Sequence, residues 1–291
     1  MTANSDGILN LADGRKLGYS QWGAADAPPL LYCHGFPSNR RELDLIQPVL
    51  ERRQVDARVV ALNRPGYGPS TFQEDRGFLD WPLDVAEAAD KLGIGRFAVL
   101  GVSGGCPYAL ACGYVLGDRV TRIGIAVGMG PIDATGMKQA TAISGPSALG
   151  LVRRLQFGMA AMAFRKGQEA RFVEQSVASM GAADQAVMLR PEVREWFTEA
   201  MRESFEQGGR TASHEAGLYR RRWGFNPQHI TAAKTRFWYG GADQTVPVSA
   251  GRWLADRVSG SDFTLWPQHG HFSWMIDDEA ADAIAATAGG L

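Results

Sequence analysis

The chain has 291 residues, of which 45% are hydrophobic and 21% are charged, a composition that is typical of a globular domain able to bury a sizeable core. Thirty Lys and Arg residues against 31 Asp and Glu residues leave a formal net charge of −1. This balance excludes a global field that would attract nucleic acid or an anionic membrane, so any partner has to be selected by a specific site.

The three cysteines are odd in number and have no C-x-x-C spacing, which argues against a disulfide framework or a structural zinc site. The first 16 residues contain no basic segment followed by an apolar core, and no later apolar run approaches the roughly 18 residues of a membrane helix. We therefore expect a cytoplasmic protein that acts away from membranes, as a monomer or homodimer.

The first 130 residues alternate between short apolar runs and helical patterns. Residues 8–23 predict two strands joined by a hairpin turn at Asp13-Gly14. The later apolar runs are typical of parallel strands that are buried on both faces of a sheet. These runs cover residues 29–35, 57–63, 96–103 and 122–128, and the helical patterns cover residues 39–53, 80–92 and 104–116. The order predicts an α/β fold with a mostly parallel twisted sheet flanked by helices.

The alternation stops near residue 131, and the pattern then stays helical as far as residue 230. Seven of the nine methionines lie in this segment or at its threshold. One helix begins at Pro191 and carries Trp196 and Met201 on a single apolar face. We predict that residues 131–230 are an all-α insertion.

The strand pattern returns after the insertion. Apolar runs at residues 235–241 and 262–267 predict two more strands, and a last helix begins near residue 272. The predicted α/β core therefore consists of residues 1–130 and 231–291.

Residues 101–111, GVSGGCPYALA, place one serine among three glycines between an apolar strand and a helix. Glycine has no Cβ, so it tolerates a positive φ or the close approach of another backbone segment. The spacing G-x-S-x-G in this context puts the serine on a sharp turn from strand to helix. The turn also directs the unpaired N–H groups of the helix N-terminus at the hydroxyl. Ser103 is therefore a candidate nucleophile.

A serine nucleophile needs a base, and the base needs an acid that orients it. Asp243 follows the predicted strand 235–241, and His271 follows the predicted strand 262–267. Both loops are expected to leave the same edge of the sheet as Ser103. The segment HGFP at residues 34–37 follows an early strand and can offer the N–H of Phe36 opposite that of Gly104 as an oxyanion site.

These motifs resemble the α/β hydrolase superfamily, in its serine-nucleophile branch of esterases, lipases and perhydrolases. The resemblance covers nearly the whole chain and rests on HGFP at 34–37, NRPGYGPS at 63–70, GVSGG at 101–105, YGGADQTVP at 239–247 and GHFSW at 270–274.

The resemblance implies a role for each matched residue. Ser103 would be the nucleophile, His271 the general base and acid, and Asp243 the acid that orients it. The N–H groups of Phe36 and Gly104 would form the oxyanion hole. The resemblance also implies that the insertion is a helical cap over the site. Dehalogenases and epoxide hydrolases of this superfamily use Asp at the position of Ser103, so those activities are not expected.

Two alternatives concern the acid and the base. Asp243 could instead cap a helix that begins near residue 246, and Asp133 is then the substitute acid. His269 competes with His271 as base, but the resemblance favours the histidine directly before the aromatic residue that opens the last helix. No metal is expected at these two histidines, because no carboxylate or third histidine stands at ligand spacing nearby.

No cofactor is expected either. The chain has no phosphate loop that ends in Gly-Lys-Ser/Thr, and no G-x-G-x-x-G segment follows a strand. The expected partner is a small-molecule substrate.

Candidate substrate contacts are His34, Trp196, Met201 and Trp223. Each has a structural interpretation as well: His34 can support the oxyanion loop through its ring nitrogens, and apolar stripes on cap helices can be core. A cap must nevertheless present one face to the cleft, and methionine forms an adaptable apolar lining. This favours a substrate with a medium-sized apolar acyl or alcohol group.

The resemblance implies a carboxylesterase-like serine hydrolase that cleaves an ester, lactone or thioester through an acyl-enzyme on Ser103. Two other activities would use the same residues, namely cofactor-free perhydrolysis and the hydrolysis of carbon–carbon bonds. A hypothesis of another class is a ligand-binding receptor or scaffold, because function depends on the site rather than on the fold.

Overall fold

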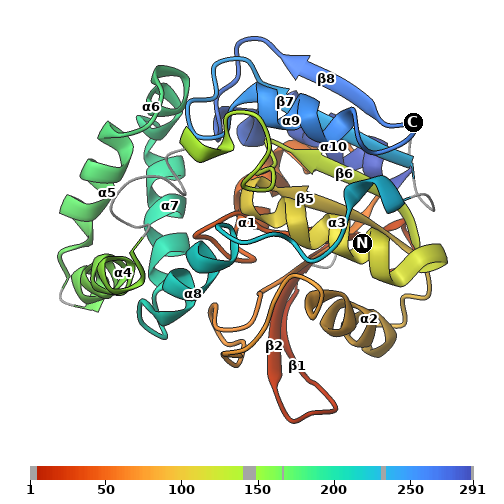
Figure 1. Ribbon diagram of the computed structural model, residues 1–291, viewed down its shortest axis with the longest axis horizontal. Coiled ribbons are helices and arrows are strands. Elements are labelled where there is room, and N and C mark those ends of the chain that lie inside the picture. The colour runs from red at the N-terminus through yellow and green to blue at the C-terminus, as the bar shows by residue number, and fades with distance from the viewer. Residues whose placement is uncertain (1–4, 140–148, 166, 231–233, 290–291) are drawn as a thin grey trace.

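The computed structural model describes residues 5–139, 149–165, 167–230 and 234–289 (Figure 1). Within these ranges no helix combines the length and the apolar character needed to cross a membrane. All three cysteines are buried and free.

In the described residues, eight strands form one sheet in the order β1-β2-β4-β3-β5-β6-β7-β8. The hairpin strands β1 and β2 are antiparallel, β2 is antiparallel to β4, and the other neighbours are parallel. This confirms the predicted mostly parallel sheet and the hairpin at Asp13-Gly14. The strands are β1 Ser5–Asn10, β2 Lys16–Trp22, β3 Pro29–Cys33, β4 Arg58–Leu62, β5 Phe97–Val102, β6 Val120–Ala126, β7 Lys234–Gly240 and β8 Asp262–Trp266.

Helices cover both faces of the sheet, as the continuous apolar strands require. Side chains alternate between the faces along a strand, so the neighbours Leu30 and Leu31 on β3 join two different core clusters. One cluster packs against α2 (Trp81–Lys91), α3 (Cys106–Leu116) and α9 (Val248–Ala255). The other packs against α1 (Glu42–Arg52) and α10 (Asp278–Ala288). Short 3-10 helices are Ser103–Gly105, Gly117–Arg119, Met137–Gln139, Pro227–His229 and Ser273–Ile276.

Five described helices between β6 and β7 form a cap that lies beside the sheet core (Figure 1). They are α4 Gly150–Arg165, α5 Glu169–Ala178, α6 Ala182–Met188, α7 Pro191–Ser204 and α8 Arg210–Leu218. The predicted insertion, residues 131–230, includes them all. Near its two ends, however, Met137 and Ile230 pack in the sheet core, and residues 140–148 lie outside the described part.

A buried carboxylate, Glu215 of α8, makes one of the contacts that dock the cap on the core. Its two oxygens accept hydrogen bonds from Arg64 at 2.7 and 3.0 Å, from Arg76 at 2.8 Å, and from the hydroxyls of Tyr67 at 2.8 Å and Tyr108 at 2.7 Å. Burial alone would raise the pKa of Glu215, but the two guanidinium groups outweigh this effect and hold the pKa well below its usual range. The carboxylate is therefore charged and fully paired.

Replacing Glu215 by Gln should lower the free energy of unfolding by about 3–5 kcal/mol, because two buried guanidinium groups lose their counter-charge. The pKa of Glu215 is depressed in the folded state. Its contribution to stability is therefore present above the ordinary value of 4.5 and is lost as the pH falls toward the lowered pKa. Urea denaturation at neutral and acidic pH measures both effects. The matched control Glu195→Gln changes an exposed carboxylate of the cap and should stay within about 0.5 kcal/mol. An equally small change in Glu215→Gln would contradict the interpretation that Glu215 is the charged partner of two buried guanidinium groups.

Candidate active site

Ser103 lies at the point where the chain turns from β5 into α3. Its φ of +51° is in the left-handed region, which is unfavourable for a side chain with a Cβ and marks a strained turn. The N–H of Met129 donates to the Ser103 carbonyl at 2.9 Å and fixes the turn. Gly105 is required here, since a Cβ on it would lie 2.0 Å from the carbonyl oxygen of Cys33. The turn therefore raises the Ser103 hydroxyl above the carboxyl edge of the sheet.

The structure brings Ser103, His271 and Asp243 together in one hydrogen-bonded chain. His271 Nε2 lies 2.8 Å from Ser103 Oγ, and His271 Nδ1 lies 2.8 Å from Asp243 Oδ2. The three residues come from the ends of β5, β7 and β8, which meet at one edge because the strands are parallel. His271 can thus accept a proton at Nε2 while Asp243 holds its Nδ1–H.

Asp243 makes both of the contacts that the sequence left open as alternatives. Its Oδ1 accepts the N–H groups of Thr245 at 2.7 Å and Val246 at 2.9 Å, which closes the loop before α9. Its Oδ2 faces His271. The alternative acid, Asp133, is exposed. Capping and orientation are therefore compatible, because a carboxylate has two oxygens.

Burial and neighbouring charges act in opposite directions on His271. Burial favours the neutral ring, but it is outweighed by Asp243, both through its charge and through its hydrogen bond, with further support from the charges of Asp184 and Glu42. The pKa of His271 is consequently raised above its ordinary value of 6.5. The same interactions that raise the pKa stabilise the imidazolium that forms when the ring takes a proton.

The segments that carry the two predicted oxyanion amides abut beside Ser103. A Cβ on Gly104 would lie 2.6 Å from Cβ of Phe36, and a Cβ on Gly35 would lie 3.5 Å from Cβ of Ser103. The Gly104 carbonyl is held by the hydroxyl of Tyr219 at 2.8 Å. Both amide-bearing segments are thus fixed next to the hydroxyl.

We call residues 34–37, HGFP, the oxyanion strap after their predicted role. The His34 side chain supports this strap rather than facing the cavity. Its Nε2 accepts the N–H of Arg64 at 3.2 Å, and its Nδ1 lies 3.0 Å from the carbonyl of Gly35. The Arg64 guanidinium also donates to the Gly35 carbonyl at 2.7 Å and to the His34 carbonyl. The structure therefore does not bring His34 to the expected position of a substrate contact.

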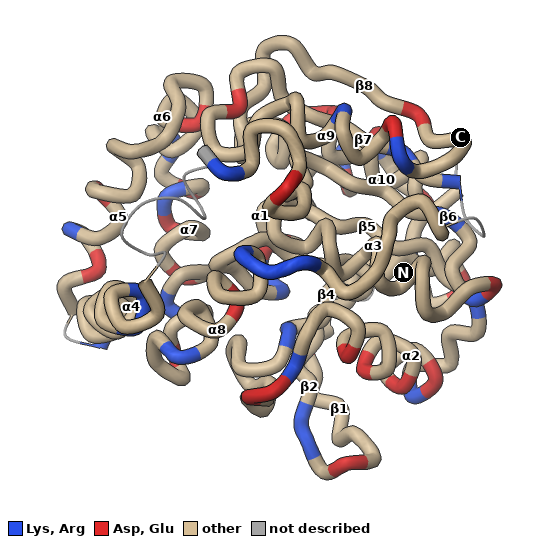
Figure 2. Tube along the Cα trace, in the orientation of Figure 1, with Lys and Arg blue, Asp and Glu red and all other residues tan. Residues whose placement is uncertain are grey.

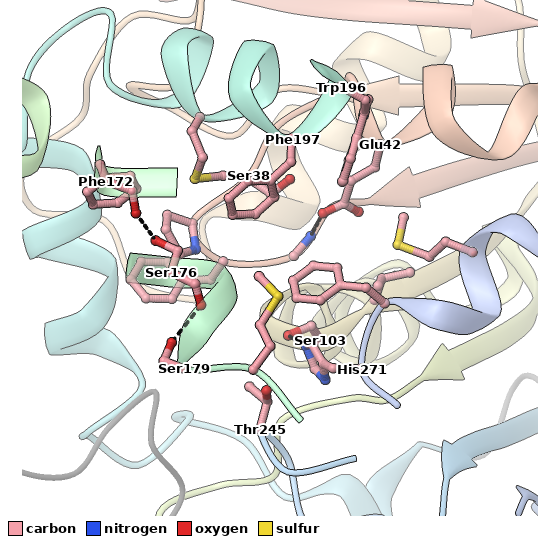
Figure 3. Close-up of a pocket in the computed structure, with 18 of the residues that line it drawn as sticks. Ser38, Glu42, Ser103, Phe172, Ser176, Ser179, Trp196, Phe197, Thr245 and His271 are labelled. Carbon is pink, nitrogen blue, oxygen red and sulfur yellow. Dashed lines mark hydrogen bonds between the residues drawn. The ribbon is translucent and has the colours of Figure 1, made fainter. Parts of the chain in front are cut away.

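A cavity of about 400 Å³ lies above Ser103 and His271, between the core and the cap (Figure 3). Trp196 and Met201 of α7 are on its wall, as expected. Trp223 is not, because it packs in the sheet core against Phe78 and Phe225. Aromatic and methionine side chains form most of the apolar part of the wall, namely Phe36, Phe157, Phe172, Met180, Trp196, Phe197, Met201, Phe272 and Met275.

Glu42 is a cavity residue that the sequence reasoning missed. It is buried at the start of α1 and faces the cavity, where its carboxylate accepts the Gly35 N–H at 2.9 Å (Figure 3). It also accepts the Tyr32 hydroxyl at 2.8 Å. Burial raises the pKa of its carboxyl group. An acidic residue on the apolar face of a predicted helix, directly after HGFP, is the signal that could have identified it.

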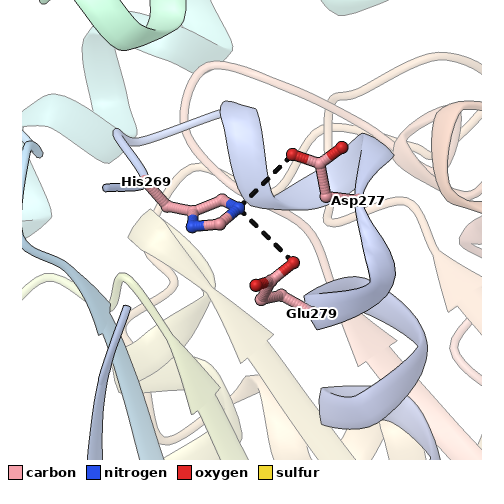
Figure 4. A group of neighbouring side chains, drawn as sticks. All are labelled: His269, Asp277 and Glu279. Carbon is pink, nitrogen blue, oxygen red and sulfur yellow. Dashed lines mark ion pairs between the residues drawn. The ribbon is translucent and has the colours of Figure 1, made fainter. Parts of the chain in front are cut away.

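His269 has two carboxylate neighbours that the sequence reasoning did not expect. Its Nε2 lies 3.3 Å from Asp277 Oδ2 and 3.4 Å from Glu279 Oε2 (Figure 4). The expectation that no carboxylate lies nearby is wrong, because the 3-10 helix Ser273–Ile276 turns the chain back toward His269. Asp277 is the N-cap residue of α10 and Glu279 lies in its first turn, where negative charge stabilises a helix in any case.

A family model described as the alpha/beta hydrolase family matches residues 30–287. The chain belongs to the α/β hydrolase family. Two curated proteins match shorter stretches of this hydrolase. The bifunctional esterase/perhydrolase DCH of Acinetobacter calcoaceticus is 34% identical over 89 residues, which are 30% of this chain and 32% of that protein. A serine hydrolase-like protein of Danio rerio is 32% identical over 87 residues, 29% of this chain and 26% of that protein. The matches thus span about a third and a quarter of the relatives' length.

Solved structures resemble the α/β hydrolase over its whole length. A hydrolase from Pseudomonas aeruginosa PA01 has a TM-score of 0.72 at 20% identity and covers 98% of both chains. An esterase from Exiguobacterium antarcticum has a TM-score of 0.73 at 16% identity, with 98% and 99% coverage. A bromoperoxidase from Bacillus anthracis has a TM-score of 0.65 at 17% identity, with 98% and 97% coverage. At these identities the likeness establishes the fold alone.

The Asp243–His271 contact can be tested by NMR titration of the His271 ring. We expect a midpoint above 6.5, and a lower midpoint in Asp243→Asn, because the variant removes the counter-charge and presents an amide to Nδ1. Asp133→Asn is the matched control and should leave the midpoint unchanged. A midpoint that falls in the control and not in Asp243→Asn would instead identify Asp133 as the partner.

Proposed function

We propose that this α/β hydrolase is a serine esterase that cleaves an ester-like bond of a small to medium-sized apolar substrate through an acyl-enzyme on Ser103. The observation that carries the proposal is the continuous hydrogen-bonded chain from Asp243 through His271 to Ser103 at the floor of an apolar cavity. A nucleophile, its base and the orienting acid are what acyl transfer needs.

In the first half of the reaction, neutral His271 takes the Ser103 proton at Nε2 while Oγ attacks the acyl carbon. The oxyanion that forms accepts hydrogen bonds from the N–H groups of Phe36 and Gly104. The bond to the leaving alcohol then breaks, and His271 returns its proton to that oxygen. Asp243 stabilises the imidazolium between these two transfers.

In the second half, water replaces the alcohol. His271 removes a proton from the water as the water oxygen attacks the acyl carbon of the Ser103 ester. The bond between the acyl carbon and Ser103 Oγ then breaks, His271 gives its proton to Oγ, and the carboxylic acid is released. The atoms and charges of the two half-reactions balance without a redox step or an external cofactor.

The proposed substrate class follows from the cavity wall. Its volume of about 400 Å³ suits a small molecule, and its aromatic and methionine side chains favour an apolar acyl or alcohol group. Basic and acidic residues occur all along the trace in Figure 2, and the longest blue run in the view lies near its centre. The formal net charge of −1 supports a small neutral substrate rather than a polyanion as the partner.

Perhydrolysis is the second candidate, favoured by the partial match to the bifunctional esterase/perhydrolase of Acinetobacter calcoaceticus. Hydrogen peroxide would then replace water in the second half and release a peroxycarboxylic acid from the same acyl-enzyme. Measuring acid and peracid formation from one ester at increasing peroxide concentration separates the two activities.

Labelling with a fluorophosphonate probe tests the proposed nucleophile. The probe should modify the peptide that contains Ser103, and Ser103→Ala should lose labelling and about 10⁴- to 10⁶-fold of the esterase kcat. Ser176→Ala is the matched control, because Ser176 also lines the cavity but its hydroxyl donates to the Phe172 carbonyl. If folded wild-type protein stays unlabelled and hydrolyses no ester in a chain-length panel, the receptor hypothesis takes the place of the proposal.

Enlarging the cavity should change the preferred chain length. Phe172→Ala removes an aromatic side chain from the wall, so kcat/KM should shift toward longer acyl chains in a panel of p-nitrophenyl esters. Met162→Ala changes an exposed side chain of α4 outside the cavity and should keep the wild-type profile. An unchanged profile in folded Phe172→Ala would place the acyl group elsewhere.

A further inference from the structure

The backbone of the loop that carries His271 donates hydrogen bonds to a carboxylate of the cap. Asp184 of α6 accepts three successive backbone N–H groups: those of His271 at 2.8 Å, Phe272 at 2.7 Å and Ser273 at 3.1 Å. Such a row of N–H groups forms a concave site for an anion. Here the anion is a side chain that lies 87 to 89 residues away in the sequence.

The fit between Asp184 and this loop is close. Asp184 is 1% exposed, and a Cβ on Gly270 would lie 2.5 to 2.6 Å from all three atoms of its carboxyl group, so the approach requires a glycine. The loop has further supports of its own, since Gly270 N–H donates to Ser273 Oγ and Trp274 Nε1–H donates to the His271 carbonyl. From the cap, Phe197 of α7 packs its ring on Phe272, and Asp184 supplies a carboxylate that accepts the backbone N–H groups of the loop.

We propose that Asp184 is a positioning residue that ties the cap to the catalytic histidine, so that a docked cap is part of what sets the Ser103–His271 geometry. The inference rests on the proposed esterase function. Asp184 is not on the cavity wall and touches neither Ser103 nor the imidazole ring, so it acts through the backbone of His271.

The arrangement of the two oxygens explains why an amide cannot replace the carboxylate. Of these three hydrogen bonds, Oδ2 accepts the one from the His271 N–H, and Oδ1 accepts those from the Phe272 and Ser273 N–H groups. An asparagine has a single acceptor oxygen, so its NH₂ group must oppose at least one N–H donor. A shift of the His271 backbone moves Nε2 away from Ser103, and small misplacements of a catalytic group are costly in rate.

Asp184 also contributes charge to the surroundings of His271. The charged or titratable groups that raise the pKa of the ring are Asp243 after β7, Asp184 on α6 and Glu42 on α1. Removing the charge at residue 184 should therefore lower the pKa of His271, which a purely structural support would not do.

The test compares Asp184→Asn with the matched cap control Glu195→Gln in a pH series of esterase kinetics, with active sites counted by fluorophosphonate labelling. We expect kcat of Asp184→Asn to fall about 10- to 100-fold, with KM within about twofold. We also expect the acidic limb of the kcat/KM profile to shift to lower pH. Glu195→Gln should match wild type.

A second variant separates charge from fit and covers the case in which Asp184→Asn does not fold. Asp184→Glu keeps the charge but lengthens the side chain by one methylene, so the acidic limb should stay in place while kcat falls, by less than in Asp184→Asn.

The inference would be overturned if folded Asp184→Asn had wild-type kcat and an unchanged acidic limb of its kcat/KM profile. If only Asp184→Glu folds, wild-type kcat in that variant would overturn it. Failure of the proposed function itself is distinguishable, because wild-type protein would then be neither labelled on Ser103 nor active on esters.

Discussion

The carboxylate of Glu215 is the constraint on which the arrangement of the site depends. It is fully buried and carries a charge, which is tolerated only because two guanidinium groups and two phenol hydroxyls donate to it. Glu215 belongs to the cap, whereas Arg64 follows β4 and also holds the carbonyls of the oxyanion strap. One ion-pair network therefore fixes the cap, the loop after β4 and the strap relative to one another.

The core contributes the reacting groups through topology. Parallel strands end at the same edge, so loops that are far apart in the sequence deliver Ser103, Asp243 and His271 to one place. The positive φ of Ser103 is strained in isolation, but glycines around it and the bond from Met129 N–H allow the turn to persist. A rigid sheet edge thus presents the hydroxyl and the imidazole at hydrogen-bonding distance.

The features that could be predicted from the sequence are those encoded in short segments. Apolar strand runs, the Asp13-Gly14 turn and the glycines around Ser103 are local patterns, and each indicates its structure without knowledge of the rest of the chain. Chain order and strand ends were also enough to expect Asp243 and His271 beside Ser103, and the structure brings them there.

The features that could not be predicted depend on long-range packing. Trp196 in REWF and Trp223 in RRWGF both follow charged residues in the sequence, yet Trp196 lines the cavity and Trp223 packs in the sheet core. Local sequence does not distinguish these two environments, because each depends on what the side chain meets in the folded chain. The carboxylates near His269 and the bond from Asp184 to His271 likewise arise from tertiary contacts that no periodicity reveals. A buried acid in a cap helix has no partner that is visible in its own segment.

The cap therefore has two chemically distinct surfaces. Its aromatic and methionine side chains form the cavity wall, where an unpaired polar group would be costly. Its two buried carboxylates, Asp184 and Glu215, lie off that wall and bind the backs of the loops that carry the imidazole and the oxyanion strap. In the proposed enzyme, this separation would let the apolar wall differ between substrates while the polar contacts hold the backbone that carries His271 and the oxyanion strap. In the proposed enzyme, substrate preference would thus depend on side chains of α4, α5 and α7, and catalytic geometry on Asp184 of α6 and Glu215 of α8.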